Sequence, residues 1–336
     1  MTRPRVLVLS GPTLFRSFFD PPRERRLDRG FAWTRVAGER VTPRLRRALQ
    51  SAEALVTTWD SPCFGEELAW LAPRLRLVAH CGGEVKARFA RPLFDRLVIA
   101  NAPGPMAQRV AELAVTFVLM AARRVDAYRE ALRRPSNRVY ERLHLEGAGN
   151  ETLRGRAVGI LGLGRIGRET ARLLGPFGPR LFVHDPYLTA RAVRGQGAVP
   201  VSLRRLLRES EFLVVAAGLT PDTRGLLDRK ALRLLRDGAN VVNVARGGIV
   251  DLAALTAEVR SGRLTCALDV TDPLEPLPVR HPLRRMRGAV VTPHVGAAAV
   301  EVRRAMADIV LDTLERYFRD GRVATRVTSR MLERMT

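Results

Sequence analysis

The stretch Ala157-Val-Gly-Ile-Leu-Gly-Leu-Gly-Arg-Ile-Gly-Arg-Glu-Thr-Ala-Arg-Leu-Leu174 joins an apolar strand, a glycine-rich turn and the start of a helix. Its glycines Gly162, Gly164 and Gly167 have the G-x-G-x-x-G spacing of a dinucleotide-binding turn. The first permits a tight turn, the second lets the backbone approach a pyrophosphate, and the third allows close packing of helix and strand. Because the unpaired N–H groups at the helix start can bind phosphates, the stretch predicts a dinucleotide-binding unit.

An acidic residue ends the next predicted strand. Asp185 follows Arg180-Leu-Phe-Val-His184 and lies 18 residues after Gly167, near the spacing expected for the residue that binds the adenosine ribose. A carboxylate at this place can accept hydrogen bonds from both ribose hydroxyls and would repel a 2′-phosphate. The sequence therefore predicts NAD as the cofactor, with NADP as the alternative because Arg191 and Arg194 lie downstream.

Strands and helices alternate on both sides of this turn. Nearly continuous apolar strands, typical of a parallel sheet covered on both faces, are predicted at 157–161, 180–184, 212–216, 240–244, 265–270 and 289–292. Shorter β-type runs at 5–9, 54–57, 75–79 and 97–100 indicate a smaller α/β domain before it. A buried helix from Val110 and an irregular stretch over 133–155 lie between the two sets of strands. A last helix over 299–318 is expected to fold back onto the first domain.

These elements predict an α/β protein with two Rossmann-like or flavodoxin-like domains. Each domain is expected to be a doubly wound parallel sheet, with a cleft between the two. Residues 1–101 and 299–336 are expected to form a discontinuous substrate-binding domain, and residues 102–298 the NAD-binding domain. A chain of 336 residues with 46% apolar residues can bury cores of this size without disulfides or metals.

The formal net charge of +23 is the unusual feature of the composition. The basic residues are nearly all arginines scattered through every segment, so we expect no nucleic-acid partner. Three widely separated cysteines without metal-ligand spacing predict no metal site and fit a reducing cytosol. The longest apolar run, 110–122, has 13 residues and contains Glu112, well short of the about 20 that cross a bilayer. The sequence therefore predicts a cytoplasmic protein with no membrane segment.

Three polar residues follow the carboxyl ends of the later strands, the edge at which parallel sheets bind ligands. They are Arg246, Glu275 and His294. Reduction of a 2-oxo acid needs a cation for the carboxylate, a proton donor for the carbonyl oxygen, and an anion that keeps this donor charged. Arginine binds a carboxylate through two parallel hydrogen bonds, histidine titrates near neutrality, and a neighbouring carboxylate favours the imidazolium. Each residue alone also fits a structural role, but their joint placement points to catalysis.

The chain resembles the D-isomer-specific 2-hydroxyacid dehydrogenase family over most of its length. The matching segments are Gly159-Ile-Leu-Gly-Leu-Gly-Arg-Ile-Gly167, Asp185-Pro-Tyr187, Leu219-Thr-Pro-Asp-Thr-Arg-Gly225, Asn243-Val-Ala-Arg-Gly-Gly-Ile-Val-Asp251, Ala267-Leu-Asp-Val270, Glu275-Pro-Leu-Pro278 and Thr292-Pro-His294. The resemblance implies that Arg246 binds the substrate and that His294, paired with Glu275, is the acid/base. It also implies a homodimer, and a contact between Asp269 and the nicotinamide carboxamide. The cofactor site that it implies comprises Gly162, Gly164, Arg165, Ile166, Gly167, Asp185, Ala245, Asp269 and Gly296.

The chain departs from the family pattern in three places. The expected substrate loop reads His80-Cys-Gly-Gly-Glu-Val-Lys86 where the family often has G-x-G-x-D-x-I-D. Gly82 and Gly83 remain, and their backbone N–H groups are the predicted binding site for the substrate carboxylate. Ala216-Ala-Gly218 stands where the family usually has a histidine and a proline beside the cofactor. The run from Asp269 to Glu275 is one residue longer than is common in the family.

The sequence therefore predicts an NAD-dependent oxidoreductase that transfers a hydride between the nicotinamide and C2 of a small D-2-hydroxy acid or 2-oxo acid. The alternative is an NAD(H)-sensing, corepressor-like interaction protein, because transcriptional corepressors use the same fold. His80 lies at the start of the atypical loop and is a further candidate for a role in substrate specificity.

Overall fold

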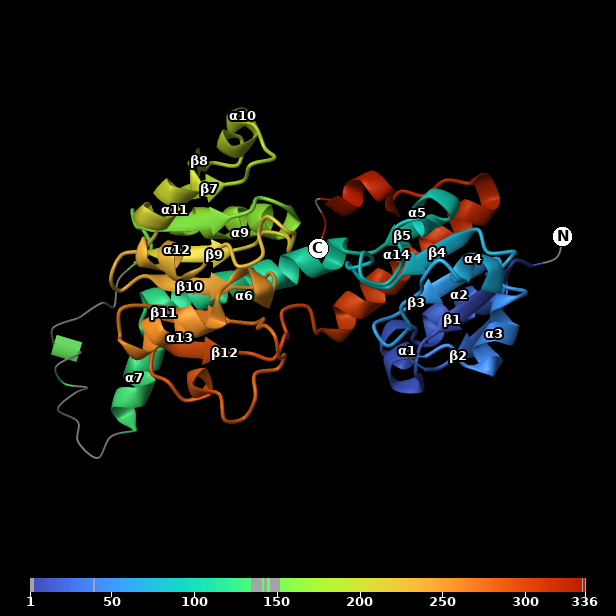
Figure 1. Ribbon diagram of the computed structural model, residues 1–336, viewed down its shortest axis with the longest axis horizontal. Helices are drawn as coiled ribbons and strands as arrows, with labels where there is room; N and C mark the ends of the chain where they lie inside the picture. The colour runs from blue at the N-terminus through green and yellow to red at the C-terminus, as the bar shows by residue number, and fades with distance from the viewer. Residues whose placement is uncertain are drawn as a thin grey trace. The chain divides into compact units, whose positions relative to one another are not determined.

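The computed structural model of the protein divides into two compact units (Figure 1). Unit 1 contains residues 1–106 and 298–336, and unit 2 contains residues 107–297. The sequence placed these limits at 101/102 and 298/299, a few residues away. The structure describes residues 3–38, 40–133, 141, 144–145, 152–333 and 335. Most of the irregular stretch predicted over 133–155 therefore lies outside the described residues.

Unit 2 is built on a parallel sheet with the strand order β12-β11-β10-β9-β6-β7-β8. The strands are β6 (Ala157–Leu161), β7 (Arg180–His184), β8 (Val199–Pro200), β9 (Phe212–Val215), β10 (Asn240–Asn243), β11 (Thr265–Leu268) and β12 (Ala289–Val291). The chain reverses its direction of winding between β6 and β9, which is the position at which doubly wound sheets bind ligands. The sequence predicted all of these strands except β8, whose two residues are too few for a periodic pattern.

Helices cover both faces of this sheet, because successive strand residues point to opposite sides. Leu161 and Val215 pack with α11, α12 and α13, whereas Ile160 and Val214 pack with α6, α9 and α10. The helices of unit 2 are α6 (Gly104–Ala122), which begins in unit 1, α7 (Val125–Leu132), α9 (Arg165–Leu174), α10 (Ala190–Arg194), α11 (Leu203–Glu209), α12 (Arg229–Arg233) and α13 (Leu252–Arg260). Short 3₁₀ turns occur at η1 (Gly175–Phe177), η2 (Gly247–Ile249) and η3 (Pro282–Arg284).

Unit 1 contains the second sheet, with the order β13-β5-β4-β3-β1-β2. Its strands are β1 (Arg5–Leu9), β2 (Ala32–Val36), β3 (Ala54–Thr57), β4 (Leu77–His80), β5 (Val98–Asn101) and β13 (Arg326–Val327). All neighbours are parallel except β13, which runs antiparallel to β5. These two parallel-sheet units confirm the predicted fold class.

The sequence prediction missed β2 and β13. β2 is an edge strand that pairs only with β1, and most of its residues are at least partly exposed, so its sequence Ala-Trp-Thr-Arg-Val is mixed rather than apolar. β13 has two residues and forms only through its contact with β5. Both strands are defined by their partners more than by their own pattern.

The helices of unit 1 also lie on both faces of their sheet. They are α1 (Pro12–Phe18), α2 (Pro21–Gly30), α3 (Pro43–Leu49), α4 (Leu68–Leu71), α5 (Leu93–Arg96) and α14 (Val300–Asp320), with the 3₁₀ turn η4 (Ser329–Glu333). Leu55 and Val78 pack with α3, α4 and α5, whereas Val56 and Ala79 pack with α1, α2 and α14. The last long helix of the chain therefore shares a core with its first residues.

Ion pairs join α2 to α14 within unit 1. Arg26 donates to Asp312 at 2.8 Å and to Glu315 at 2.7 Å, and Arg23 donates to Asp308 at 2.5 Å. The hydrogen bond that Arg26 donates to Glu315 is the first of several causes that raise the pKa of Arg26 above its usual value. These contacts fix the C-terminal helix against the N-terminal part of the chain.

Helix α6 is long and apolar enough, at 19 residues, to cross a membrane by length and composition alone. It is longer than the 13-residue run read from the sequence because it starts at Gly104 with Pro105 in its first turn. Val110, Ala114 and Val118 are buried in the core of unit 2. This packing is that of a core helix, which passes the same test of length and composition.

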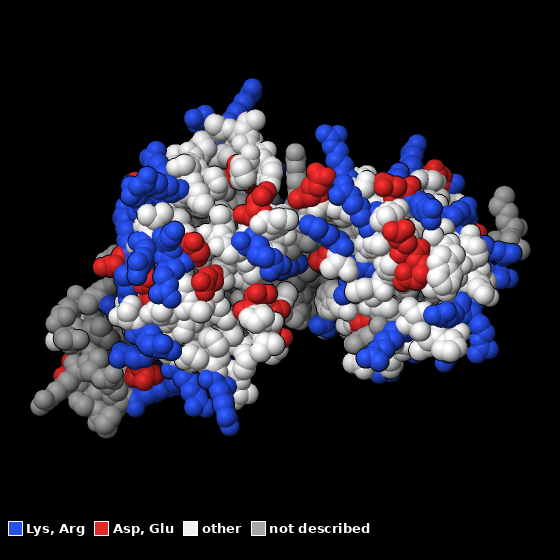
Figure 2. Space-filling view, in the orientation of Figure 1, with Lys and Arg blue, Asp and Glu red and all other residues white. Residues whose placement is uncertain are grey.

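The charged side chains are dispersed over the molecular surface. Figure 2 shows Lys and Arg side chains over the face of each unit that is drawn, with Asp and Glu side chains between them. Many arginines have acidic partners, such as Arg156 with Glu211 at 2.8 Å and Arg263 with Glu258 at 2.6 Å.

Candidate active site

The glycine-rich turn follows β6 and leads directly into α9. Gly162 has a φ of 89°, in the left-handed region that favours glycine, and a Cβ there would lie 2.6 Å from the Ala217 backbone. A Cβ on Gly167 would collide with the carbonyl of Gly162. Gly164 precedes α9 and has open space where its Cβ would be. The turn thus has the tight bend, the close helix packing and the open backbone that a pyrophosphate site requires.

Asp185 lies at the end of β7, next to this turn. Its Oδ2 accepts a hydrogen bond from the Leu163 N–H at 2.8 Å, and its Oδ1 accepts one from the Tyr187 N–H at 2.9 Å. Each carboxylate oxygen has a second lone pair for a ribose hydroxyl. The structure therefore holds the carboxylate in a fixed orientation beside the glycine turn, while Arg165 lies exposed at the start of α9.

Arg246 lies in a turn after β10 that a buried asparagine organises. The Asn243 side chain donates to the Arg246 carbonyl at 3.0 Å and accepts from the Ala245 N–H at 3.1 Å. The Arg246 guanidinium donates to the Ala245 carbonyl at 2.8 Å. Asn243 is 1% exposed, so its amide serves the backbone of this turn and not solvent.

Asp269 follows β11 and binds the turn that carries His294. Its carboxylate, 2% exposed, accepts from the Thr292 hydroxyl at 2.5 Å and from the N–H groups of Val295 at 2.8 Å and Gly296 at 2.9 Å. The His294 N–H donates to the Asp269 carbonyl at 2.8 Å. His294 has a φ of 54°, a conformation that these surrounding bonds support. Contact with a nicotinamide carboxamide, as the resemblance implies, would come in addition to these bonds.

His294 and Glu275 are in direct contact. The imidazole Nδ1 is hydrogen-bonded to Glu275 Oε1, and the other carboxylate oxygen, Oε2, accepts from the Thr271 N–H at 3.0 Å. An ionised carboxylate only accepts, so the bond to such a carboxylate places a proton on Nδ1 and leaves Nε2 as the second ring nitrogen. The longer loop therefore still brings Glu275 to His294.

The Arg246 turn packs against the Glu275 loop. A Cβ on Gly247, the residue after Arg246, would collide with the peptide group between Thr271 and Asp272. β10, β11 and β12 are neighbours in the sheet, so their carboxyl ends lie at one edge. The structure thus places all three predicted catalytic residues at one edge of unit 2.

The predicted substrate loop belongs to unit 1. The Gly82 N–H donates to the His80 carbonyl at 2.9 Å, and its carbonyl accepts from the Ala102 N–H at 2.8 Å. For the Gly83 N–H we find no acceptor in the described part of the chain, and the Gly83 carbonyl accepts from the Asn101 side chain at 2.7 Å. Of the two glycine amides predicted to bind a carboxylate, Gly83 is therefore the better candidate.

His80 is a core residue of unit 1. It is 1% exposed, and its Nδ1 is 2.9 Å from the Thr57 hydroxyl. Burial, reinforced by the charge of Arg88 and opposed by a hydrogen bond with the Thr57 backbone, lowers the pKa of His80 from 6.5 to about 3. The imidazole is therefore neutral at physiological pH, and its Nε2 lies so close to Gly82 that a Cβ on this glycine would be 2.5 Å from it.

This burial predicts that acid destabilises unit 1 through His80. Because the folded pKa of about 3 lies below the ordinary 6.5, the contribution is complete above pH 6.5 and is lost as the pH falls toward 3. The His80→Asn variant serves as the comparison, because its amide can keep the bond to Thr57 but does not titrate. When the pH is lowered from 8 to 5, we expect the free energy of unfolding of the unmodified protein to fall by about 2 kcal/mol more than that of the variant. Urea unfolding at the two pH values measures the difference, and equal losses in both proteins would contradict it.

Other reactive groups lie outside this arrangement. Burial raises the pKa of the Cys266 thiol to about 12 and also raises that of Cys81, so both are poor nucleophiles. Within the described ranges, no group of three or more possible metal ligands is found.

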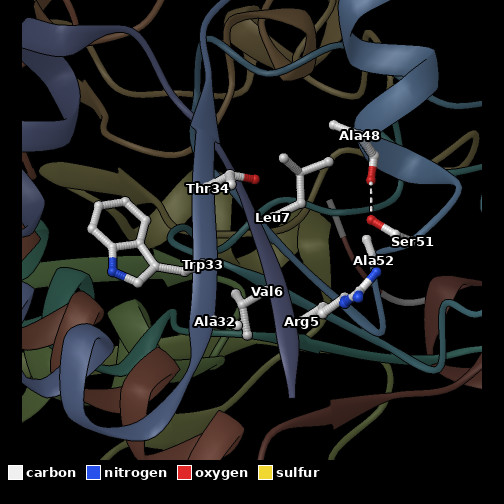
Figure 3. A pocket seen from close by; sticks show the side chains of 9 residues that line it. All are labelled: Arg5, Val6, Leu7, Ala32, Trp33, Thr34, Ala48, Ser51 and Ala52. Carbon is white, nitrogen blue, oxygen red and sulfur yellow. Dashed lines mark hydrogen bonds between the residues drawn. The ribbon is translucent and has the colours of Figure 1, made fainter. Parts of the chain in front are cut away.

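Two cavities have different relations to this site. Figure 3 shows the first, of about 320 Å³, in unit 1. It is lined by Leu7 of β1, Thr34 of β2 and Ser51 after α3, among others. None of the predicted site residues lines it. The second, of about 530 Å³, lies in unit 2 and is lined by residues of the segments 224–225, 248–253 and 272–281.

Sequence reasoning missed the residues that support the catalytic groups. Asn243 was considered only as part of a motif, Thr271 lies between two motifs and was given no role, and Asp269 was assigned only a contact with the cofactor. Their position directly after a strand end is a usable signal, because Asn, Asp and Thr side chains there commonly bind nearby backbone groups. Which backbone groups they bind depends on how neighbouring strands pair.

The chain is similar to known proteins over most of its length. Residues 115–296 match the family model described as D-isomer specific 2-hydroxyacid dehydrogenase, NAD binding domain. The D-3-phosphoglycerate dehydrogenase of Mycobacterium bovis is 34% identical over 275 residues, which are 79% of this chain and 49% of that relative. The glyoxylate reductase of Aeropyrum pernix is 34% identical over 264 residues, 77% of this chain and 78% of that relative.

The solved structures include a whole-chain match. The holo form of Rhodotorula graminis D-mandelate dehydrogenase superposes with a TM-score of 0.81 at 25% identity, covering 97% of this chain and 98% of that one. The chain spans about half the length of the mycobacterial relative, 49%. The likeness therefore covers both units, whereas the longer relative has additional sequence.

Proposed function

The chain belongs to the D-isomer-specific 2-hydroxyacid dehydrogenase family, and we propose that it catalyses NAD-dependent interconversion of a small 2-oxo acid and its D-2-hydroxy acid. Family membership confirms the resemblance seen in the sequence, and unit 2 carries the NAD-binding domain of the family. The relatives described above are named dehydrogenases or reductases, so nothing among them favours a corepressor-like role. The single observation that carries the proposal is the contact between His294 and Glu275 beside the Arg246 turn.

His294 is proposed to be the acid/base. The Glu275 carboxylate holds Nδ1, so the charged imidazole presents a proton at Nε2. In the reducing direction Nε2 gives this proton to the carbonyl oxygen of the substrate, and in the oxidising direction it takes the proton from the hydroxyl. Glu275 keeps the ring in one orientation and stabilises the positive charge during the reaction.

Arg246 is proposed to bind the 2-oxo acid. Its guanidinium presents parallel donors that match a carboxylate or a carboxylate and its neighbouring carbonyl. Within unit 1, the Gly83 N–H is proposed as a separate donor to a carboxylate. Bound NADH supplies the hydride that is added to C2, and the fit of the Gly162 turn and Asp185 to a dinucleotide supports this cofactor.

The proposed activity is tested by an oxidation screen with NADH. The purified full-length chain is mixed with NADH and, separately, glyoxylate, hydroxypyruvate, pyruvate and longer 2-oxo acids, and absorbance is followed. We expect turnover with at least one small 2-oxo acid. Tight NADH binding without turnover on any member of the panel would reject the dehydrogenase and favour NAD(H) sensing.

Asp185 is expected to set the choice of NADH over NADPH. The Asp185→Ser variant lacks the carboxylate that can bind both ribose hydroxyls of NADH and would repel the 2′-phosphate of NADPH. We therefore expect the preference for NADH, measured as kcat/KM with NADH divided by kcat/KM with NADPH, to fall about 100-fold. The matched control is Asp237→Ser, because Asp237 is an exposed carboxylate in unit 2 whose side chain is 86% exposed. An unchanged ratio in Asp185→Ser would contradict this assignment.

We also propose that the protein is a cytoplasmic homodimer. Helix α7 exposes Val125 at its start, at 43%, and Leu132 at its end, at 67%, and α6 before it carries the partly buried apolar residues Leu119 and Met120. Such an apolar surface fits a second copy of the chain. Size-exclusion chromatography with light scattering measures the molar mass of the protein in solution. The mass of two chains would support the homodimer, and the mass of one chain would contradict it.

A further inference from the structure

The loop that carries Glu275 has little apolar packing of its own. Val270 before it and Leu277 after it are buried, at 2% and 4% exposed. Between them, 272–276 are exposed, and Leu274 is 58% exposed. Apolar burial therefore fixes the two ends of the loop but not the carboxylate, which must be oriented by polar contacts.

Thr271 provides these contacts. Its hydroxyl donates to the Leu274 carbonyl at 2.6 Å and closes the turn directly before Glu275. Its N–H donates to Glu275 Oε2 at 3.0 Å, while Oε1 is bonded to His294. One residue thus binds both the backbone that precedes the glutamate and the carboxylate itself.

Thr271 is itself firmly held. It is 8% exposed, and its peptide bond with Asp272 lies so close to Gly247 that a Cβ on this glycine would collide with it. The contact joins Thr271 to the turn that carries Arg246. A rigid residue can orient a mobile one, because it loses little further conformational freedom when the bond forms.

We infer that Thr271 is a positioning residue, which orients Glu275 toward His294 through the hydrogen bond of its hydroxyl to the Leu274 carbonyl. The inference rests on the proposed function, and it explains how a loop one residue longer than is common in the family still delivers its carboxylate to the imidazole. Because Thr271 acts through Glu275, its hydroxyl affects the proton-transfer step and not the binding of NADH.

The test is the pair of variants Thr271→Val and Thr271→Ser. Valine keeps the shape but removes the hydroxyl, so we expect kcat to fall about tenfold with KM for NADH unchanged. Serine keeps the hydroxyl and should restore most of the activity. The control is Thr256→Val, because Thr256 is 7% exposed and its hydroxyl also donates at 2.6 Å to a backbone carbonyl, that of Leu252 in α13. This control should leave kcat unchanged.

A double variant shows whether Thr271 acts through Glu275. In the Glu275→Gln background, Thr271→Val should reduce kcat less than twofold further, because the carboxylate that it orients is already gone. A full tenfold loss in that background would overturn the inference. So would normal activity in Thr271→Val, or equal losses in the valine and serine variants, which would indicate packing of the side chain and not its hydroxyl.

Failure of the inference can be distinguished from failure of the proposed function. If the unmodified protein is inactive on the whole panel of 2-oxo acids, the proposed function fails. A crystal structure of Thr271→Val then still tests the positioning role. We expect the Glu275 carboxylate to have moved away from His294, and an unchanged pair would overturn the inference.

Discussion

Replacing His294 by glutamine is expected to lower kcat by about 10²–10⁴-fold, the range for loss of a general acid/base, while NADH still binds normally. Glutamine cannot give up a proton at the position of Nε2, and the glycine turn and Asp185 that fit the cofactor lie after other strands. Stopped-flow or steady-state assays with the best 2-oxo acid give kcat, and fluorescence titration gives the affinity for NADH.

Two controls separate chemistry from backbone strain. His294 has a φ of 54°, so the second variant is His294→Asn, because asparagine tolerates this conformation and can donate to Glu275 in place of Nδ1. It should be as inactive as the glutamine variant. His281→Asn should stay active, because His281 caps η3 and asparagine is a good cap. Turnover within tenfold of normal in both His294 variants would remove this residue from the mechanism.

Arg246→Lys is expected to lower kcat/KM for the 2-oxo acid about 100-fold with NADH affinity unchanged. Lysine keeps the positive charge but lacks the planar fork that makes two parallel hydrogen bonds, and a hydrogen bond to a charged group contributes about 1.5–3 kcal/mol. The loss therefore reports the geometry of substrate binding and not the net charge of the site. Steady-state kinetics at several substrate concentrations measures it.

The matched control for this variant is Arg260→Lys. Arg260 is an exposed residue at the end of α13 in the same unit, so the exchange tests the general effect of replacing an arginine. We expect kcat/KM to stay within twofold. Similar losses in Arg246→Lys and Arg260→Lys would show that the effect is not specific to the turn after β10.

The sequence predicted the parallel sheet of unit 2 well because its strands are buried on both faces. The strands β6 and β9 consist of apolar or glycine residues that are fully buried, so nearly every position carries the signal. The edge strand β2 and the two-residue strands β8 and β13 were missed, because partly exposed or very short strands carry little signal of their own. The glycines of the turn could be assigned separate roles in advance because each role is a local backbone constraint.

The candidate site was predicted as a set of residue types but not as a network. That Arg246, Glu275 and His294 lie at one sheet edge follows from the order of parallel strands. The Asp269 carboxylate under the His294 turn and the Thr271 hydroxyl on the Leu274 carbonyl could not be predicted, because they depend on the conformations of two loops. The sequence also suggested His80 as a specificity residue because it begins the atypical loop. The structure shows its ring buried against Thr57, which the sequence could not reveal.

The fold class and the glycine turn could be predicted from the sequence, and so could the kinds of side chain at the site, because strand burial, helix periodicity and backbone freedom are local properties of the chain. The contact of Glu275 with His294 across a lengthened loop is visible in the folded structure alone. That contact joins residues that follow β11 and β12, so it forms only after the two strands have paired and Thr271 has closed the turn. Hydrogen bonds between loops are set by this pairing and leave no periodic pattern in the sequence.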